Sequence, residues 1–288
     1  MDKGDFMNKL IIAQSDLGVN IDGASEGAKV LADSLNYQKY VVSNKNIKKD
    51  YNDKNLRKNE REINKTTKKI FNLAKSILNN NEFPILIGGD HSVAIGSALA
   101  SQEFYKNIGI IWIDAHGDFN TFETTPSGNI HGMPLAAITG YKCNELTDFI
   151  TNNYVDPKKC VILGARDIDE GEYINIKDSG VTIISQDDIE NIGINNALEK
   201  AIEIASDNTN KIHISFDLDV IDPKFVSGVT TKVPNGISDQ DSYFIIQKLK
   251  YIKDKISSFD LVEYNSLNDT NENTKKIALK ILEIFLSE

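Results

Sequence analysis

The sequence predicts an α/β fold, a three-layer α/β/α domain with a central parallel sheet of eight strands. Eight short apolar runs, rich in β-branched residues, recur along the chain with segments of helical length between them. Strands that alternate with helices form parallel sheets with right-handed crossovers. The runs are apolar at successive positions, which is typical of strands covered by helices on both faces. We find no repeat or linker, so we expect one domain over residues 1–288.

The expected strands extend from the N-terminus to the last quarter of the chain. In order they cover residues 9–13, 39–42, 84–88, 108–114, 160–165, 181–184, 211–217 and 257–263. Apolar residues at helical spacing from Ile63 to Leu78, and again over residues 274–287, predict two helices with one buried face each. Residues 43–69 are dense in Lys, Asn, Asp and Glu, which indicates a solvated loop that runs into an exposed helix face.

The composition indicates a folded, acidic, cytoplasmic protein. Hydrophobic residues make up 40% of the chain, charged residues 26%, and the formal net charge is −10, as in globular rather than disordered chains. We expect no nucleic-acid or membrane partner, since an acidic protein attracts cationic small molecules instead. The two cysteines lack CxxC spacing, which favours a reducing compartment. The sequence shows neither a signal-peptide core nor an apolar stretch of membrane-spanning length.

Acidic and histidine side chains gather where four of the expected strands end. They are Asp90 and His91 after the third strand, Asp114, His116 and Asp118 after the fourth, Asp217, Asp219 and Asp222 after the seventh, and Glu263 after the eighth. Ligands of open parallel sheets bind at the carboxyl ends of the strands. Residues i, i+2 and i+4 of an extended chain point to one side, so Asp114, His116 and Asp118 can face one point.

Carboxylates in this number require cations. Four of them in a poorly solvated cleft would take up protons unless positive charge were present, and two divalent ions balance four aspartates. Oxygen ligands with one imidazole for each metal and no thiolate favour Mn²⁺, while Co²⁺, Fe²⁺ and Zn²⁺ stay open. Two metals ~3.5–4 Å apart can hold a bridging water and lower its pKa toward neutrality. The negative charge that remains favours a cationic electrophile as substrate.

Each residue has an ordinary structural alternative when it is taken alone. An Asp at a strand end is commonly a helix cap or a turn former, and a histidine inside an apolar strand, such as His213, is usually a core residue. Caps do not explain a DxHxD and a DxD sequence on separate strands together with His91. The combination therefore predicts a metal site.

The same residues lie in motifs that resemble the ureohydrolase (arginase–agmatinase) family. The matching stretches are "GGDHS" (88–92), "DAHGDFN" (114–120), "SGNIHGMPLA" (127–136), "SFDLDVIDP" (215–223) and "VEYN" (262–265), in the order and spacing of the family. The similarity covers roughly residues 8–285, and the chain most resembles the bacterial arginases. The resemblance implies the arginase-like fold and a homotrimer or homohexamer.

The resemblance also implies two Mn²⁺ ions in each subunit. The ligands of the first would be His91, Asp114, Asp118 and Asp217. The ligands of the second would be Asp114, His116, Asp217 and Asp219. A hydroxide that bridges the metals would attack the guanidinium carbon of L-arginine and give L-ornithine and urea.

Three residues have catalytic roles by the same resemblance. Asp118 would pass a proton to the leaving amine, and Glu263 would hold the guanidinium by a charge-assisted hydrogen bond. His131 would carry protons between the site and solvent. Without its motif, His131 would be interpreted as an exposed loop histidine.

Two loops decide which guanidino compound is the substrate. One resembles the arginase loop that binds the α-carboxylate and supplies Asn120, Thr125 and Ser127, whose neutral donors suit that task. The other resembles the segment that meets the α-amino group and supplies Asp169 and Glu172. Both favour L-arginine. The alternatives are agmatine, formiminoglutamate or another guanidino acid, and a metal-binding protein without catalytic activity.

The chain departs from the family pattern outside the predicted ligands. The usual Gly-Thr-Pro after the Asp-Pro segment is Thr230-Thr231-Lys232, and the next Gly-Gly is Asn235-Gly236. The Asn-Pro after the glutamate is Asn265-Ser266, and an N-terminal Gly-Pro is Glu26-Gly27. Thr231 still falls where a substrate-binding hydroxyl beside the guanidinium is expected.

Overall fold

In the computed structural model, which describes residues 7–44, 47, 49 and 57–287, the expected strands form one parallel sheet. The sheet has eight strands in the order β2-β1-β3-β8-β7-β4-β5-β6. In chain order the strands are β1 Asn8–Gln14, β2 Lys39–Ser43, β3 Phe83–Ile87, β4 Ile108–Ile113, β5 Cys160–Leu163, β6 Thr182–Ile184, β7 Lys211–Asp217 and β8 Ile256–Val262. The predicted sheet and its parallel pairing are therefore confirmed.

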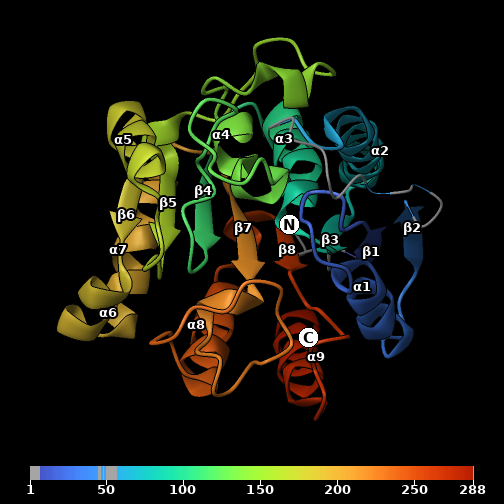
Figure 1. Ribbon diagram of the computed structural model, residues 1–288, viewed down its shortest axis with the longest axis vertical. Coiled ribbons are helices and arrows are strands. Elements are labelled where there is room, and N and C mark those ends of the chain that lie inside the picture. The colour runs from blue at the N-terminus through green and yellow to red at the C-terminus, as the bar shows by residue number, and fades with distance from the viewer. Residues whose placement is uncertain (1–6, 45–46, 48, 50–56, 288) are drawn as a thin grey trace, which may run out of the picture.

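Helices cover both faces of the sheet (Figure 1). On one face lie α2 Glu60–Asn79, α3 Ala94–Tyr105, α4 Pro134–Ile138 and α5 Glu170–Ser179. On the other face lie α1 Ala24–Asp33, α6 Gln186–Ile192, α7 Ile194–Ser206, α8 Asp239–Tyr251 and α9 Asn273–Leu286. Short 3-10 helices are η1 His91–Val93, η2 Ile130–Gly132, η3 Asn144–Thr147, η4 Pro157–Lys159, η5 Leu218–Val220 and η6 Lys253–Lys255. The predicted three-layer arrangement is confirmed.

Each face of the sheet has its own apolar core because successive strand residues point to opposite sides. In β4, Ile111 and Ile113 pack into the cluster on the α7 side, whereas Ile110 and Trp112 pack into the cluster on the α3 side. Every residue of β4 is buried. This two-sided burial explains why β4 is a continuous apolar run rather than an alternating one.

The helix expected from Ile63 to Leu78 is α2, whose apolar residues are buried against the sheet. Its opposite face is exposed at Arg61, Lys65 and Lys68, as the charged stretch predicted. Residues 45–46, 48 and 50–56 of that stretch lie outside the described residues. The second predicted helix, over residues 274–287, is α9.

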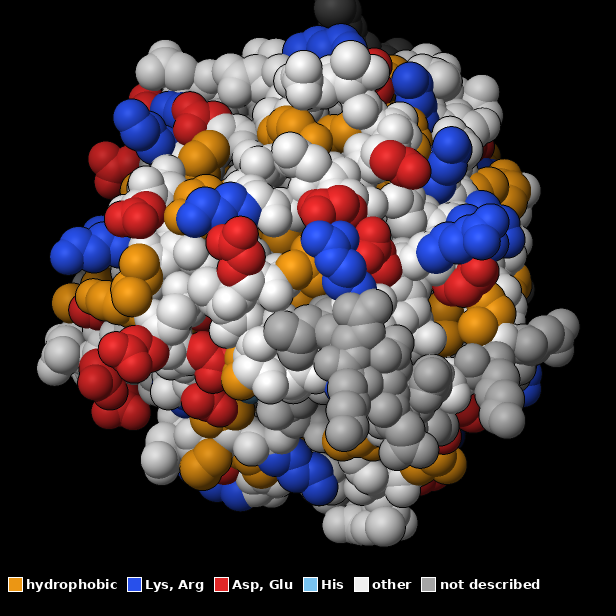
Figure 2. Space-filling model, turned by 45° about the horizontal axis from the view of Figure 1, so that its top comes forward, with side chains coloured by type: hydrophobic (Ala, Val, Ile, Leu, Met, Phe, Trp, Pro, Cys, Tyr) orange, Lys and Arg blue, Asp and Glu red, His pale blue; other side chains and the backbone are white. Residues whose placement is uncertain are grey.

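The surface of the described residues carries both signs of charge. On the face drawn in Figure 2, the coloured Lys and Arg side chains lie interspersed with Asp and Glu. Among the described helices, none is both long and apolar enough to cross a membrane. Cys143 and Cys160 are buried free thiols.

The order of the strands places the functional side chains together. Strands β3, β8, β7 and β4 are successive neighbours at the centre of the sheet. These are the four strands whose carboxyl ends lead into the acidic and histidine residues of the sequence. Parallel pairing puts all four ends at one edge, so residues far apart in sequence meet there.

Candidate metal centre

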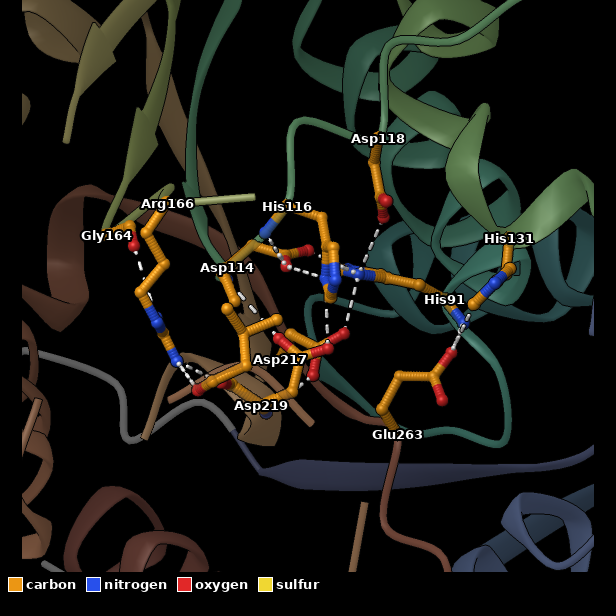
Figure 3. A network of polar contacts seen from close by, with 12 residues as sticks. His91, Asp114, His116, Asp118, His131, Gly164, Arg166, Asp217, Asp219 and Glu263 are labelled. Carbon is orange, nitrogen blue, oxygen red and sulfur yellow. Dashed lines mark hydrogen bonds and ion pairs between the residues drawn. The ribbon is translucent and has the colours of Figure 1, made fainter. Parts of the chain in front are cut away.

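The six predicted metal ligands converge at the carboxyl edge of the sheet (Figure 3). Asp114 directly follows β4, Asp217 is the last residue of β7, and His91 begins η1 after β3. The other three lie in the segments that continue from these strands: His116, Asp118 and Asp219. All six are buried except His116, which is partly buried.

Three carboxylates surround one nitrogen of His91. The Nδ1 atom lies 3.0 Å from Asp114 Oδ2, 3.0 Å from Asp118 Oδ2 and 3.1 Å from Asp217 Oδ2. This buried nitrogen has no hydrogen-bond partner among the described residues, and neither has Asp118 Oδ2. A single imidazole N–H cannot satisfy three carboxylates at once. A cation among these four atoms satisfies all of them, which is how metal ligands are arranged.

A second group of ligand atoms adjoins the first. His116 Nδ1 lies 3.1 Å from Asp219 Oδ2 and 3.4 Å from Asp114 Oδ1. The two oxygens of Asp114 therefore face different histidines, Oδ2 toward His91 and Oδ1 toward His116. Asp114 belongs to both groups of potential ligands. The donor set fits two neighbouring divalent cations that share this carboxylate.

The position of Asp217 differs from a symmetrical bridge. Its Oδ2 joins the His91 group, while its Oδ1 accepts the backbone N–H of Asp219 at 2.8 Å. That hydrogen bond begins η5, which carries Asp219 back toward His116. Asp217 thus both supplies a ligand atom and fixes the turn that positions the next one.

The protonation of the site also indicates cation binding. Burial raises the pKa of Asp118 to about 6 and raises the pKa of Asp217 well above its usual range, and neighbouring carboxylates add to both effects. Burial lowers the pKa of His91 and His116, but the adjacent carboxylates outweigh it and raise both pKa values. Without cations the cluster therefore holds protons in their place, as expected for buried carboxylates.

The ligands after β4 converge by a route that differs from the expected one. An extended chain through Asp118 was predicted, but β4 ends at Ile113. Asp118 has a left-handed backbone, with φ of 50°, and its carbonyl accepts the N–H of Leu135 at 3.0 Å. A non-glycine residue is rare in this region. A turn held by tertiary contacts, rather than strand alternation, aims Asp118 at His91.

Two residues outside the predicted site, Trp112 and Ser215, orient His91 and Asp114. The indole of Trp112 stacks on the His91 ring, with centroids 4.0 Å apart and planes 10° apart, and its Nε1–H donates to Asp114 Oδ2 at 3.0 Å. Ser215 Oγ lies 2.8 Å from His91 Nε2. Contacts of this kind hold metal ligands in place. Spacing of two residues, Trp112 to Asp114 and Ser215 to Asp217, is the sequence signal that could have revealed them.

Other acidic and histidine residues at this edge have structural contacts. Asp90 accepts the N–H groups of Gly18 and Ser92, both at 3.0 Å. Asp222 accepts the N–H groups of Lys224 and Gly236, at 2.9 and 3.1 Å. His213 is a buried core residue, as expected, with Nδ1 2.7 Å from Ser258 Oγ.

The altered loop near the site is held by Arg166. Its guanidinium donates to the carbonyls of Asp219, Val233 and Pro234, at 2.9, 2.9 and 3.0 Å. Asn235, which differs from the glycine that the family resemblance implies, adopts a left-handed backbone with φ of 62°. Asn tolerates this conformation better than most residues. Anchored in this way, the loop places Thr231 on the wall of the site.

His131 and Glu263 form a buried pair beside the ligand cluster. Their Nδ1 and Oε1 atoms are 3.2 Å apart, and Glu263 Oε1 also accepts the N–H of His91 at 2.9 Å. Burial alone raises the pKa of Glu263, but His131, Thr230 and the His91 amide outweigh it and lower the pKa. Burial lowers the pKa of His131, but Glu263 outweighs it and raises the pKa. The pair therefore favours a carboxylate beside an imidazolium.

A cleft of about 130 Å³ opens onto the ligand cluster. All six predicted substrate-binding residues line it, and so does His131. The six are Asn120, Thr125, Ser127, Asp169, Glu172 and Thr231. Asn129 and Asp167, which were not among the predicted site residues, also line it.

Hydrogen bonds within the cleft define which donors stay available to a ligand. The hydroxyl oxygens of Thr125 and Ser127 accept the N–H groups of Gly128 and Asn129, at 3.0 and 3.2 Å. Each hydroxyl therefore keeps its own proton to donate. Asn120 Nδ2 donates to Asp169 Oδ2 at 2.9 Å and has a second N–H. These groups can bind an anionic group at this end of the cleft.

Glu172 has a structural role that its motif did not reveal. It is buried and accepts the N–H groups of Phe119 at 2.7 Å and Asp169 at 3.2 Å. The second bond is part of the capping box that begins α5. Burial raises the pKa of Glu172 to about 8, with Asp118 and Asp169 adding to the effect.

Comparisons with known proteins show the family of this chain. A model of the Arginase family matches residues 10–287. The arginase of Staphylococcus aureus (strain COL) is 39% identical over 244 residues, which cover 84% of this chain and 80% of that protein. The arginase of Bacillus subtilis (strain 168) is 37% identical over 246 residues, 84% of this chain and 81% of that protein.

The fold is shared as well. The crystal structure of Entamoeba histolytica arginase in complex with L-ornithine has a TM-score of 0.89 and 31% sequence identity. The superposition covers 98% of this chain and 99% of that one. The family resemblance predicted from the motifs is confirmed: this chain belongs to the arginase family.

Proposed function

We propose that this protein is a binuclear Mn²⁺-dependent arginase, which hydrolyses L-arginine to L-ornithine and urea. The observation that carries the proposal is the convergence of carboxylates on His91 Nδ1 and, through Asp114, on His116. Such a set of oxygen and imidazole donors suits Mn²⁺. The arginase names of the relatives, at up to 39% identity over most of the chain, support arginine as the substrate.

The metal ligands in this proposal form two overlapping sets. One consists of His91, Asp114, Asp118 and Asp217. The other consists of Asp114, His116 and Asp219, together with Asp217 as the family resemblance implies. When bound, the two ions would activate water as a nucleophile near neutral pH.

The residues of the chain bind the guanidinium and manage protons. Glu263, whose pKa is lowered, is a carboxylate at neutral pH and would hold the guanidinium by charge-assisted hydrogen bonds. His131 lines the cleft and has a raised pKa, so its imidazolium can donate a proton and regain one from solvent. Asp118 would carry the proton to the leaving amine. Thr231, on the cleft wall, would add a hydroxyl beside the guanidinium.

The amino-acid end of arginine would lie at the cleft rim. The free donors of Asn120, Thr125 and Ser127 would bind the α-carboxylate, which agmatine lacks. Asp169, exposed at the rim, and Glu172 would meet the α-amino group. A substrate positive at one end and zwitterionic at the other matches this distribution of groups.

Urea release from L-arginine and from agmatine, by protein supplied with Mn²⁺, tests the proposal. We expect a clear preference for L-arginine and two bound Mn²⁺ for each chain, counted by elemental analysis after dialysis. Equal or faster hydrolysis of agmatine would assign the activity to a different amidinohydrolase. Hydrolysis of neither compound would leave a metal-binding protein without this activity. Light scattering tests the predicted homotrimer or homohexamer.

A further inference from the structure

Acidic residues in the cleft disfavour the α-carboxylate of an amino-acid substrate. Of its acidic lining residues, Asp118, Asp217 and Asp219 would be offset by the bound cations, and burial raises the pKa of Glu172 to about 8. Asp167 and Asp169 remain, and none of the described lining residues is Lys or Arg. The α-carboxylate of arginine would approach neutral hydroxyl and amide donors in this acidic surrounding. Carboxylates are repelled by like charge unless a cation offsets it. A positive group near the carboxylate-binding loop would therefore decide how well such a substrate binds.

One lysine is attached directly to that loop. Lys58 Nζ donates to the carbonyl oxygen of Ser127 at 2.7 Å, and Ser127 lines the cleft. Lys58 is partly buried, and this hydrogen bond holds its charge at the rim rather than leaving it free in solvent. Among the described residues, no acidic side chain forms an ion pair with Lys58.

The residues on either side of Lys58 fix its position. Arg57 lies over the ring of Phe122, 4.3 Å from the centroid, and Phe122 belongs to the same loop as Ser127. Asn59 Nδ2 donates to the carbonyl of Leu17 at 3.0 Å. These contacts hold the chain before α2 against two loops of the site, so the Lys58 ammonium has a defined place beside Ser127.

We infer that Lys58 is a specificity-determining residue, whose charge favours guanidino substrates that carry an α-carboxylate over those that lack one. This inference rests on the proposed function. Lys58 acts through the field of its ammonium and does not touch the reacting atoms. Because the charge lies near the surface, its effect is comparable to that of an exposed ion pair, about three- to fivefold in binding, and salt should weaken it.

The test compares Lys58→Gln with wild type on L-arginine and agmatine, the latter as substrate or competitive inhibitor. Gln keeps an N–H donor for the Ser127 carbonyl but removes the charge. We expect the KM for L-arginine to rise about three- to fivefold at low salt, with kcat and the agmatine constant unchanged. The rise should shrink at high salt, and Lys58→Arg should restore the wild-type KM. Lys65→Gln, on the exposed face of α2 and paired with Glu62, is the matched control and should have no effect.

Three results would overturn the inference while leaving the proposed function intact. They are an unchanged arginine KM in Lys58→Gln, an equal change for agmatine, and an equal effect of Lys65→Gln. The second would mean that Lys58 only maintains the shape of the loop. If the wild-type protein itself does not hydrolyse arginine, the proposed function fails and this inference fails with it.

Discussion

The Glu172 carboxyl group predicts how the stability of the protein depends on pH, because burial raises its pKa to about 8. An unfolded glutamate has lost its proton by about pH 5.5, whereas in the folded protein Glu172 keeps its proton up to about pH 8. Between these values the folded state binds one more proton than the unfolded state, so stability falls as pH rises. The contribution is fully present below about pH 4.5 and is lost as the pH approaches about 8.

The magnitude follows from about 1.4 kcal/mol for each pH unit. From pH 5 to pH 8, the metal-free wild-type protein should lose about 3–4 kcal/mol of stability through Glu172 alone. Glu172→Gln removes the ionisable group. The two Glu172 oxygens accept the N–H groups of Phe119 and Asp169, and a Gln side chain has only one acceptor oxygen, so the variant loses one of these hydrogen bonds. The variant should therefore be less stable than wild type at pH 5, by about 1–3 kcal/mol for the lost hydrogen bond. This deficit should shrink or reverse by pH 8, because only the wild-type protein has the pH-dependent loss from Glu172.

Urea denaturation of metal-free protein at both pH values measures this difference. Deprotonation of other buried carboxylates, such as Asp118 and Asp217, also lowers the stability of the protein as the pH rises. This loss occurs in both proteins and cancels when they are compared. Glu170→Gln, an exposed change in the same turn of α5, is the control and should behave like wild type. If Glu172→Gln and wild type lose the same stability between pH 5 and pH 8, the reasoning is refuted.

Three further predictions concern the site. Trp112→Phe keeps an aromatic ring on His91 but removes the N–H donor to Asp114. Mn²⁺ affinity, measured by calorimetry, should therefore fall about 10- to 100-fold. The control Phe259→Leu, on the opposite face of the sheet, should leave Mn²⁺ affinity unchanged. His131→Asn should lower kcat by about 10²-fold or more with little change in KM, because proton transfer rather than binding is lost. Asn120→Ala with Ser127→Ala should raise the KM for L-arginine about tenfold or more, because two donors to a carboxylate are lost, and should leave agmatine unaffected.

Each of these has an opposing result. Undiminished Mn²⁺ affinity in Trp112→Phe would show that the indole only fills space. A large rise in KM with constant kcat in His131→Asn would assign that histidine to binding. An unchanged arginine KM in the double variant would mean that this loop does not hold the carboxylate.

The sequence by itself determined the fold class and the elements. Strands buried on both faces are mostly apolar, and the chain has eight short runs rich in apolar residues. Each run forms a strand within one or two residues of its expected ends. Helix α2 follows in the same way, since its buried residues repeat at helical spacing. These features depend on local chemistry and burial, which the order of residues records directly.

The sequence also identified the kinds of residues in the site, because paired aspartates and histidines at strand ends have few structural uses. Tertiary structure alone decided how they meet. The neighbouring positions of β3, β8, β7 and β4 bring Glu263, His91, Asp217 and Asp114 to one place, and strand order depends on contacts between distant segments. The left-handed turn at Asp118, the indole of Trp112 beneath the ligands and the attachment of Lys58 to Ser127 depend on such contacts too. Local spacing could not predict them, because each is stabilised by a partner that lies elsewhere in the chain.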